Sequence, residues 1–376
     1  MSGGARGFIG GVERQTSLMA RWFAGRGYSV SVLTWDEGQE DGVEIDGVRV
    51  LKMCREDAGV KGVRFLWPKW TSLIAAMRRA NADVYYQNCG EYVTGQVALW
   101  CRQHGRKFIY SVANDTDCDG RLPEMHTVRD RTLYRYGLKA ADAVIVQTHR
   151  QQDMLRTDFE RDSIVIPMPC PGPPRGEDVN RTRGAGGSCP VLWIGRICEQ
   201  KRPDWLLDVA GACPDLRFDL VGPAADTEYA RRICERATGM ANVVLCGPAA
   251  RDQVPRFYRR AQVMCCTSGF EGFPNTFLEA WSHGLPIVST FDPDQLIADN
   301  GMGIVAQDQQ GLVSGIRILL TDRQRWQHAS RAARQYYLDN HTVDSVMARF
   351  ERVFRQVMSR NSHDGSEIER VGICQS

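Results

Sequence analysis

The chain has 376 residues, of which 43% are hydrophobic and 24% charged, and its formal net charge is +2. This length is too great for one ordinary core and predicts two domains. The near-neutral charge gives no reason to expect a nucleic-acid partner. No stretch reaches the roughly twenty apolar residues that span a bilayer, and the first residues lack the apolar core of a signal peptide. We therefore expect a cytoplasmic protein whose thirteen cysteines are reduced.

Short apolar runs with the character of strands alternate with helical patterns along the whole chain. This alternation predicts an α/β protein with two Rossmann-like parallel sheets, and the natural active site of such a protein is a cleft between its domains. The expected strands are 28–34, 83–87, 108–112 and 143–147 in the first half, and 191–194, 217–221, 242–245 and 263–267 in the second.

Composition places the boundaries between these domains. We expect a first domain over residues 1–168, a Pro/Gly-rich linker over 169–190 and a second domain over 191–341. Apolar residues at helical spacing predict a helix over 342–358. The tail over 359–376 is polar and short, and we expect it to be disordered.

The most informative segment is Phe-Glu-Gly-Phe-Pro-Asn-Thr-Phe-Leu-Glu, residues 270–279. The apolar run before it predicts a buried strand, and its glycines and proline place Glu271 on a loop. Asn275 is a candidate N-cap for a helix that Gly284 and Pro286 end, which puts Glu279 one turn into that helix. A strand, a glycine turn and a helix N-terminus leave backbone N–H groups for a phosphate, and flanking carboxylates accept hydrogen bonds from sugar hydroxyls.

This segment resembles the Glu-x7-Glu motif of the retaining family-4 glycosyltransferases, which have the GT-B fold. The resemblance implies that Glu271 faces the donor hexose and Glu279 the ribose, and that the loop between them holds the donor through backbone amides. The alternative is that both are solvated charges, the usual fate of glutamate. The donor-binding residues expected in this loop are Gly272, Phe273, Pro274, Asn275 and Thr276.

A second motif lies upstream, where the apolar run 191–194 ends at Gly195 and basic residues follow. Gly195, Arg196 and Lys201 meet the family's Gly-Arg-x4-Lys pattern, and by resemblance the two cations bind the donor diphosphate. A diphosphate needs fixed cations as well as amide donors, which explains these residue types. We expect Arg202, in contrast, to be a surface cation.

The N-terminus departs from the family pattern. Gly10 and Gly11 resemble the family's glycine loop, which binds the donor phosphate, and a helix with an apolar face should follow them. A flexible tail is the alternative. Residues 1–9 contain too few apolar side chains to form the strand that should precede this loop. We therefore expect the first sheet to lack a central strand and to be destabilised.

The family resemblance implies a retaining hexosyltransferase that moves a sugar from a UDP- or GDP-linked donor to a glycan or lipid-linked hydroxyl acceptor. It needs no metal and no cofactor beyond this co-substrate, because Arg196 and Lys201 stabilise the leaving diphosphate while Glu271 orients the sugar. Scattered histidines agree with the absence of a metal site. The alternatives are a nucleotide-sugar epimerase and a non-catalytic binding subunit.

Two features of the first domain concern the acceptor. Asp115 or Asp117 could orient an acceptor hydroxyl, although an Asn/Asp turn is the simpler interpretation. Residues 61–79 mix basic and aromatic side chains, which suits peripheral contact with the inner face of a membrane. A core-packing helix with a solvated basic side is the favoured alternative for this segment.

Overall fold

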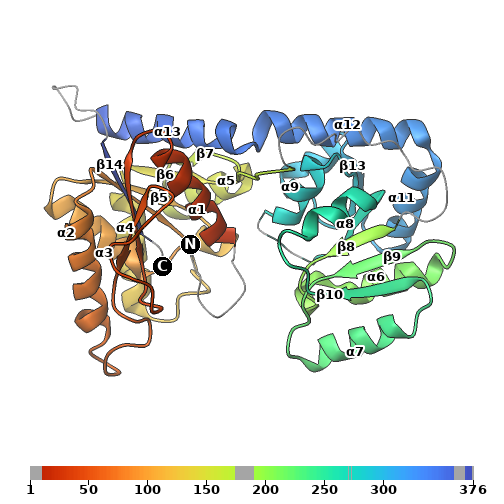
Figure 1. Cartoon of the computed structure of the whole chain (residues 1–376), viewed down its shortest axis with the longest axis horizontal. Coiled ribbons are helices and arrows are strands. Elements are labelled where there is room, and N and C mark those ends of the chain that lie inside the picture. Colours follow the sequence, from red (N-terminus) through yellow and green to blue (C-terminus); the bar gives the residue numbers. More distant parts are fainter. Residues whose placement is uncertain (1–10, 174–189, 270, 272, 360–368, 375–376) are drawn as a thin grey trace. The chain divides into compact units, whose positions relative to one another are not determined.

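The computed structural model describes residues 11–173, 190–269, 271, 273–359 and 369–374. The chain divides into two compact units, one formed by Met1–Pro169 together with Val343–Ser376 and the other by Cys170–Thr342. Each unit is built around one mainly parallel sheet (Figure 1).

The sheet of the first unit has eight strands in the order β2-β3-β1-β14-β4-β5-β6-β7. Only the β2–β3 pair is antiparallel among the described strands. The strands are β1 (Ser29–Thr34), β2 (Glu44–Ile45), β3 (Val48–Lys52), β4 (Val84–Asn88), β5 (Lys107–Ser111), β6 (Ala143–Val146), β7 (Ile164–Val165) and β14 (Arg370–Cys374).

Helices cover both faces of this sheet. One apolar core contains Leu73, Val97 and Tyr134 of α2, α3 and α4, and the other contains Met19 and Phe350 of α1 and α13. The helices are α1 (Gly11–Ala24), α2 (Thr71–Ala80), α3 (Tyr92–Gln103), α4 (Val128–Ala140), α5 (His149–Phe159) and α13 (Val343–Ser359), with the short turns η1 (Phe65–Trp70) and η2 (Asp115–Asp117).

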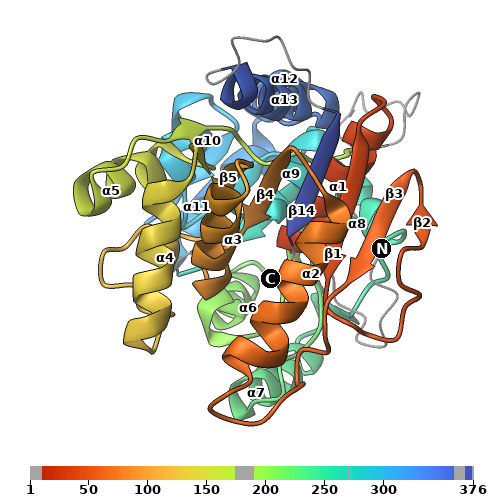
Figure 2. The ribbon, with the colours of Figure 1, turned by 90° about the vertical axis from the view of Figure 1, so that its left-hand side faces the viewer.

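The central strand β14 corrects two expectations about this unit. Residues 370–374 lie in the tail that was expected to be disordered, yet they pair in parallel with β1 on one side and β4 on the other (Figure 2). Val371 and Ile373 are buried, and a Cβ on Gly372 would lie 2.8 Å from the Tyr85 ring. We expected the first sheet to lack a central strand because of the composition of residues 1–9. The sheet instead has β14 in a central position.

The sheet of the second unit has six strands in the order β10-β9-β8-β11-β12-β13, all parallel among the described residues. Figure 1 shows α7 on one side of β8, β9 and β10 and α8 on the other. The strands are β8 (Val191–Ile194), β9 (Phe218–Val221), β10 (Val243–Gly247), β11 (Val263–Cys266), β12 (Ile287–Ser289) and β13 (Gly303–Val305).

The helices of the second unit follow their strands as in a doubly wound sheet. They are α6 (Pro203–Ala212), α7 (Glu228–Thr238), α8 (Val254–Arg260), α9 (Asn275–Ser282), α10 (Leu296–Asp299), α11 (Gln309–Thr321) and α12 (Arg323–Asn340), with the short turns η3 (Glu199–Lys201) and η4 (Pro293–Gln295). All the strands predicted from the sequence are confirmed to within two residues at each end, whereas β2, β3, β7, β12, β13 and β14 were not predicted.

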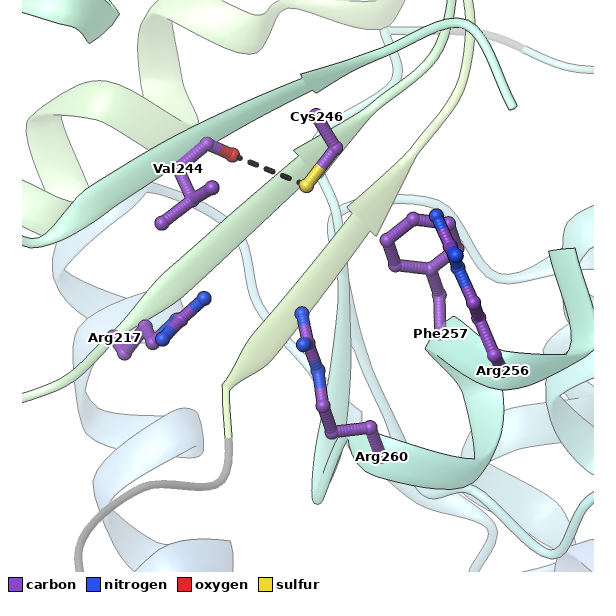
Figure 3. Close-up of a pocket in the computed structure, with 6 residues that line it drawn as sticks. All are labelled: Arg217, Val244, Cys246, Arg256, Phe257 and Arg260. Atoms are coloured by element: carbon purple, nitrogen blue, oxygen red, sulfur yellow. Dashed lines mark hydrogen bonds between the residues drawn. The ribbon is translucent and has the colours of Figure 1, made fainter. Parts of the chain in front are cut away.

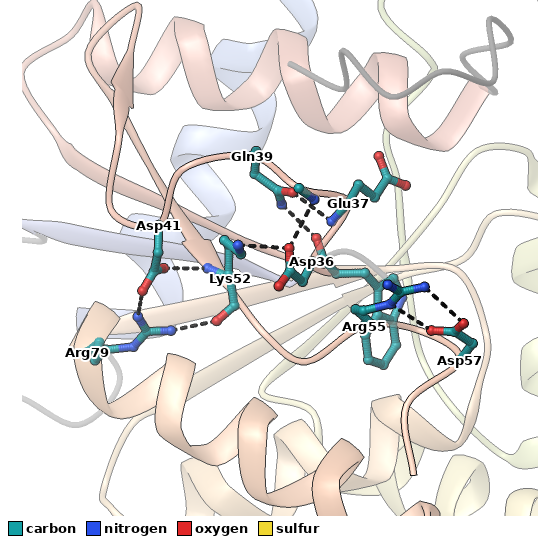
Figure 4. A network of polar contacts seen from close by, with 10 residues as sticks. Asp36, Glu37, Gln39, Asp41, Lys52, Arg55, Asp57 and Arg79 are labelled. Carbon is teal, nitrogen blue, oxygen red and sulfur yellow. Dashed lines mark hydrogen bonds and ion pairs between the residues drawn. The ribbon is translucent and has the colours of Figure 1, made fainter.

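A polar network joins α2 to the carboxyl ends of β1 and β3 (Figure 4). The Lys52 ammonium lies 2.8 Å from Asp36, and the Lys52 backbone N–H donates to Asp41 at 2.8 Å. Arg79 donates to Asp41 and, at 2.5 Å, to the Lys52 carbonyl. Arg79 is therefore engaged within the first unit and contributes less to any external anionic interface than its charge suggests.

Candidate functional site

The predicted donor-site residues of the second unit that the structure describes lie at the carboxyl edge of its sheet. Gly195 follows β8, Glu271 follows β11, and β8 and β11 are neighbours in the sheet. Ligands of open parallel sheets bind outside the carboxyl ends of the strands, so this edge is the expected place for one.

The loop after β8 presents the two predicted cations. Arg196 is exposed, and Lys201 closes the turn η3. The neighbouring loop approaches closely here, since a Cβ on Gly222 would lie 1.9 Å from the Gly195 carbonyl oxygen. Gly222 also has a φ of +141°, so a glycine is required at this approach.

Lys201 and Glu271 form an ion pair between these two loops. The Ser268 hydroxyl donates to the same oxygen of Glu271 at 2.6 Å. The Glu271 side chain is only 10% exposed, and that of Lys201 is 24% exposed. The structure thus brings together two residues that the sequence assigned to different motifs, and it adds Ser268, which sequence reasoning missed.

Arg202 holds the same two loops together, which corrects its expected role as a surface cation. Its φ of +44° turns the side chain toward the loop after β11, where the guanidinium donates to the Thr267 carbonyl at 2.7 Å and to the Ser268 carbonyl at 3.0 Å. It also donates to the Thr290 hydroxyl at 3.1 Å. In return the Thr267 hydroxyl donates to the Lys201 carbonyl at 2.7 Å. These bonds position the loop that carries Glu271.

Helix α9 begins at Asn275, one residue earlier than an Asn275 N-cap requires, so that expectation was wrong. Pro274 occupies the cap position and Asn275 is the first helical residue. No side chain caps this N-terminus among the described residues, which leaves the first-turn amides of Asn275 and Thr276 to other partners. The half-buried Phe273 ring packs edge-on against Trp281, with 6.2 Å between the ring centres. Gly272 lies outside the described residues.

Glu279 lies in the second turn of α9 and is half-buried. The Tyr258 hydroxyl, from α8, donates to Glu279 Oε2 at 2.9 Å. This bond orients the carboxylate from the neighbouring helix. Tyr258 was not singled out from the sequence, because nothing local marks a tyrosine in α8 as the partner of a glutamate in α9.

The acceptor candidates of the first unit lie in the turn η2. Asp117 is buried and accepts hydrogen bonds from the backbone N–H groups of Gly90, Ala113 and Asn114 at 3.1–3.3 Å. Burial raises the pKa of Asp117, and these bonds oppose that shift. This geometry favours the turn interpretation for Asp117. Asp115 accepts from Gln151 at 3.1 Å and is paired with Arg150.

The N-terminal glycines are only partly described. Gly10 lies outside the described residues, and Gly11 is the first residue of α1. Within the part of the chain that the structure describes, no helix is long and apolar enough to cross a membrane. The same residues contain no cluster of three or more His, Cys, Asp or Glu arranged for a metal ion.

Comparison with known proteins gives the family. A glycosyl transferase 4-like domain matches residues 10–171, and a glycosyl transferases group 1 domain matches residues 189–322. The chain belongs to the family-4 glycosyltransferases. It is 24% identical over 306 residues, 76% of each chain, to the GDP-mannose:cellobiosyl-diphosphopolyprenol alpha-mannosyltransferase of Xanthomonas campestris.

Solved structures show the fold of this glycosyltransferase. Sucrose-phosphate synthase from Thermosynechococcus elongatus superposes with a TM-score of 0.73 at 18% identity, covering 94% of this chain and 95% of that one. The pneumococcal O-GlcNAc transferase GtfA, solved with UDP and GlcNAc, gives a TM-score of 0.58 at 19% identity over 78% of this chain and 60% of its own. The two parallel α/β units have the GT-B fold.

Proposed function

We propose that this glycosyltransferase is a retaining, metal-independent hexosyltransferase that uses a nucleoside diphosphate sugar. The observation that carries the proposal is the Lys201–Glu271 pair at the carboxyl edge of the second sheet, next to the N-terminus of α9 that no described side chain caps. This arrangement offers a cation and backbone amides for a diphosphate, and a carboxylate for sugar hydroxyls.

The diphosphate would lie between Arg196, Lys201 and the start of α9. An ammonium group has three N–H donors, so Lys201 can hold Glu271 and a diphosphate oxygen at the same time. Arg196 is exposed, and its guanidinium presents a planar fork that matches phosphate oxygens. Glu279, oriented by Tyr258, would accept hydrogen bonds from the ribose.

In the proposed reaction, the acceptor hydroxyl oxygen bonds to the anomeric carbon on the face from which the diphosphate leaves. The bond from that carbon to the diphosphate oxygen breaks, and the hydroxyl proton passes to the departing diphosphate. Negative charge therefore develops on the leaving group, where Arg196, Lys201 and the α9 amides would stabilise it. No cofactor beyond the donor takes part.

Thermal unfolding with UDP, GDP, ADP and their sugars tests the donor site. One nucleotide should raise the melting temperature of the wild type but not that of an Arg196→Ala, Lys201→Ala double variant. An Arg231→Ala, Arg232→Ala variant removes the same charge from exposed positions of α7 and should respond like the wild type. A nucleotide shift that survives in the Arg196/Lys201 variant would contradict the assignment.

Product analysis tests the reaction type. The glycosidic bond of the product should keep the anomeric configuration of the donor, as measured by NMR coupling constants. Activity should survive EDTA. Inversion, or loss of activity that divalent ions restore, would contradict the proposal, and conversion of the donor sugar without an acceptor would indicate an epimerase.

We further propose that the acceptor is lipid-linked and that the first unit contacts an anionic membrane. The Xanthomonas campestris relative has a diphosphopolyprenol acceptor in its name. Helix α2 packs into the core, which agrees with the alternative interpretation of residues 61–79 as a core-packing helix. The segment before α2, however, exposes large apolar side chains beside Lys61 and Arg64. Val60, Val63, Leu66 and Trp67 are 55–73% exposed, and Val128 at the start of α4 is 81% exposed.

This apolar and basic surface suits the interface of a bilayer. Wild-type protein should float with phosphatidylglycerol vesicles at low salt, and a Leu66→Asp, Trp67→Asp variant should not. An Ile318→Asp, Leu338→Asp variant introduces the same charges at exposed apolar positions of the second unit and should still float. Equal flotation of all three proteins would refute this role of the segment.

A further inference from the structure

A hollow of about 450 Å³ lies at the β10 edge of the second sheet (Figure 3). Val243 is buried while Val244 is 37% exposed, because successive residues of a strand face opposite sides of the sheet. The hollow lies on the face of Val244 and Cys246, and α8 forms its wall. Its lining residues are Arg217, Val244, Cys246, Arg256, Phe257 and Arg260. None of the predicted donor-site residues is among them.

Three of these six residues are arginines, and none is acidic. Asp219, which is 1% exposed, accepts from Arg217 at 3.3 Å and from Arg260. One carboxylate against three guanidinium groups leaves an excess of two positive charges at the hollow. The pairing with a buried carboxylate also fixes the positions of Arg217 and Arg260, whereas free surface arginines would pay an entropic cost on binding an anion.

The remaining lining is apolar. Phe257 is buried, and the guanidinium carbon of Arg256 lies 4.8 Å from the centre of its ring. Val244 contributes an exposed aliphatic surface. Burial raises the pKa of the Cys246 thiol. The thiol donates a hydrogen bond to the Val244 carbonyl oxygen, with 3.6 Å between Sγ and the oxygen. The hollow therefore combines fixed cations with a surface that an apolar group would cover.

We propose that this hollow binds a phosphate monoester that carries an apolar or aromatic group, at a site separate from that of the sugar donor. Guanidinium forks match phosphate oxygens, and the volume lies in the range of about 300–1,000 Å³ typical of small-molecule sites. A soluble aryl or nucleoside phosphate and a phospholipid headgroup share this chemistry, so the experiment must distinguish the two sources.

Phenyl phosphate is the probe, titrated into the full chain by isothermal calorimetry. It should bind more tightly than inorganic phosphate, because only the aryl ester covers Val244 and Phe257. Arg256→Gln removes a charge and Val244→Glu places a carboxylate in the hollow, and each should weaken binding at least about tenfold. Arg232→Gln, at an exposed position of α7, is the matched control and should leave the affinity unchanged.

Saturation with the nucleotide that stabilises the wild type should leave phenyl phosphate binding intact. Vesicles containing phosphatidic acid, compared with phosphatidylcholine alone, identify the source when they are tested in a Leu66→Asp, Trp67→Asp background, which removes the proposed membrane contact of the first unit. Binding that Val244→Glu abolishes in this background supports a lipid headgroup, and a lack of vesicle binding supports a soluble ester. Displacement of phenyl phosphate by the nucleotide would overturn the proposal, as would failure of phenyl phosphate to bind or binding that neither variant weakens. None of these results decides the proposed function, because the stabilisation of the protein by nucleotides is measured in a separate experiment.

Discussion

The two parallel sheets of this glycosyltransferase are assembled from the chain in different ways. The second sheet takes all its strands from one continuous stretch, from Val191 to Val305. The first sheet places β14, from the C-terminal segment, between β1 and β4. A place in a sheet is thus filled by whichever strand offers suitable backbone pairing and apolar side chains, whatever its position in the sequence. The first sheet thus includes a strand that follows the whole second unit in the sequence.

The loops at the carboxyl ends of the two sheets also differ. In the first unit, Asp117 closes a local turn by accepting from nearby backbone amides. In the second unit, Arg202 and Lys201 connect two loops from neighbouring strands and so hold Glu271. The polar groups of the first loop stabilise the loop itself, whereas those of the second hold together the cation and the carboxylate that we propose contact the sugar donor.

The largest effect is expected from Ile373→Asp in β14. Ile373 is fully buried, so this variant should lose more than about 4 kcal/mol of unfolding free energy in the first unit. Hydrogen exchange measured by mass spectrometry should show the loss of protection in β1, β4 and β5. Protection in the second sheet and nucleotide-dependent stabilisation should remain.

The matched change in the second sheet is Leu192→Asp, at an equally buried position of β8. It should abolish protection in β8 and β11 together with nucleotide binding, and leave the first sheet protected. If both variants unfold the same segments, the two sheets are one cooperative unit and the comparison between them fails.

A smaller effect is expected from Arg202→Ala. The variant loses the bonds to Thr267, Ser268 and Thr290, which should cost about 2–3 kcal/mol of stability and weaken nucleotide binding because the Glu271 loop loosens. Arg196→Ala should weaken binding with a stability change within about 0.5 kcal/mol, since Arg196 is exposed. Urea denaturation and nucleotide titration of both variants measure the difference, and equal stability of the two would show that Arg202 does not brace the loop.

The smallest effect is expected from Tyr258→Phe, which removes the hydroxyl that donates to Glu279. The loss of one hydrogen bond should reduce nucleotide affinity by about 0.5–1.5 kcal/mol, or roughly two- to tenfold, with the first unit unaffected. A Glu279→Gln, Tyr258→Phe double variant should be no weaker than Glu279→Gln alone, if the tyrosine acts through the carboxylate. Additive losses would indicate an independent role for Tyr258.

The local sequence pattern was sufficient to predict much of the secondary structure of the second unit. The apolar run 191–194 coincides with β8, and glycines and prolines correctly bounded the loop before α9 and the end of that helix. Two predictions about the second unit were wrong for local reasons. Asn275 is the first helical residue and not the N-cap, and Arg202 has a left-handed backbone conformation and is not a surface cation. Neither the exact cap residue nor a positive φ at an arginine has a strong signature in sequence.

The sequence by itself determined the α/β class, the division into two parallel sheets and the residue types of the candidate donor site, because hydrophobic period and turn residues act over a few positions. Tertiary structure alone decided that residues 370–374 form a central strand and that Lys201 contacts Glu271. Both depend on pairing between segments far apart in the chain, and five residues in a polar tail show no local sign of the partners that bury them.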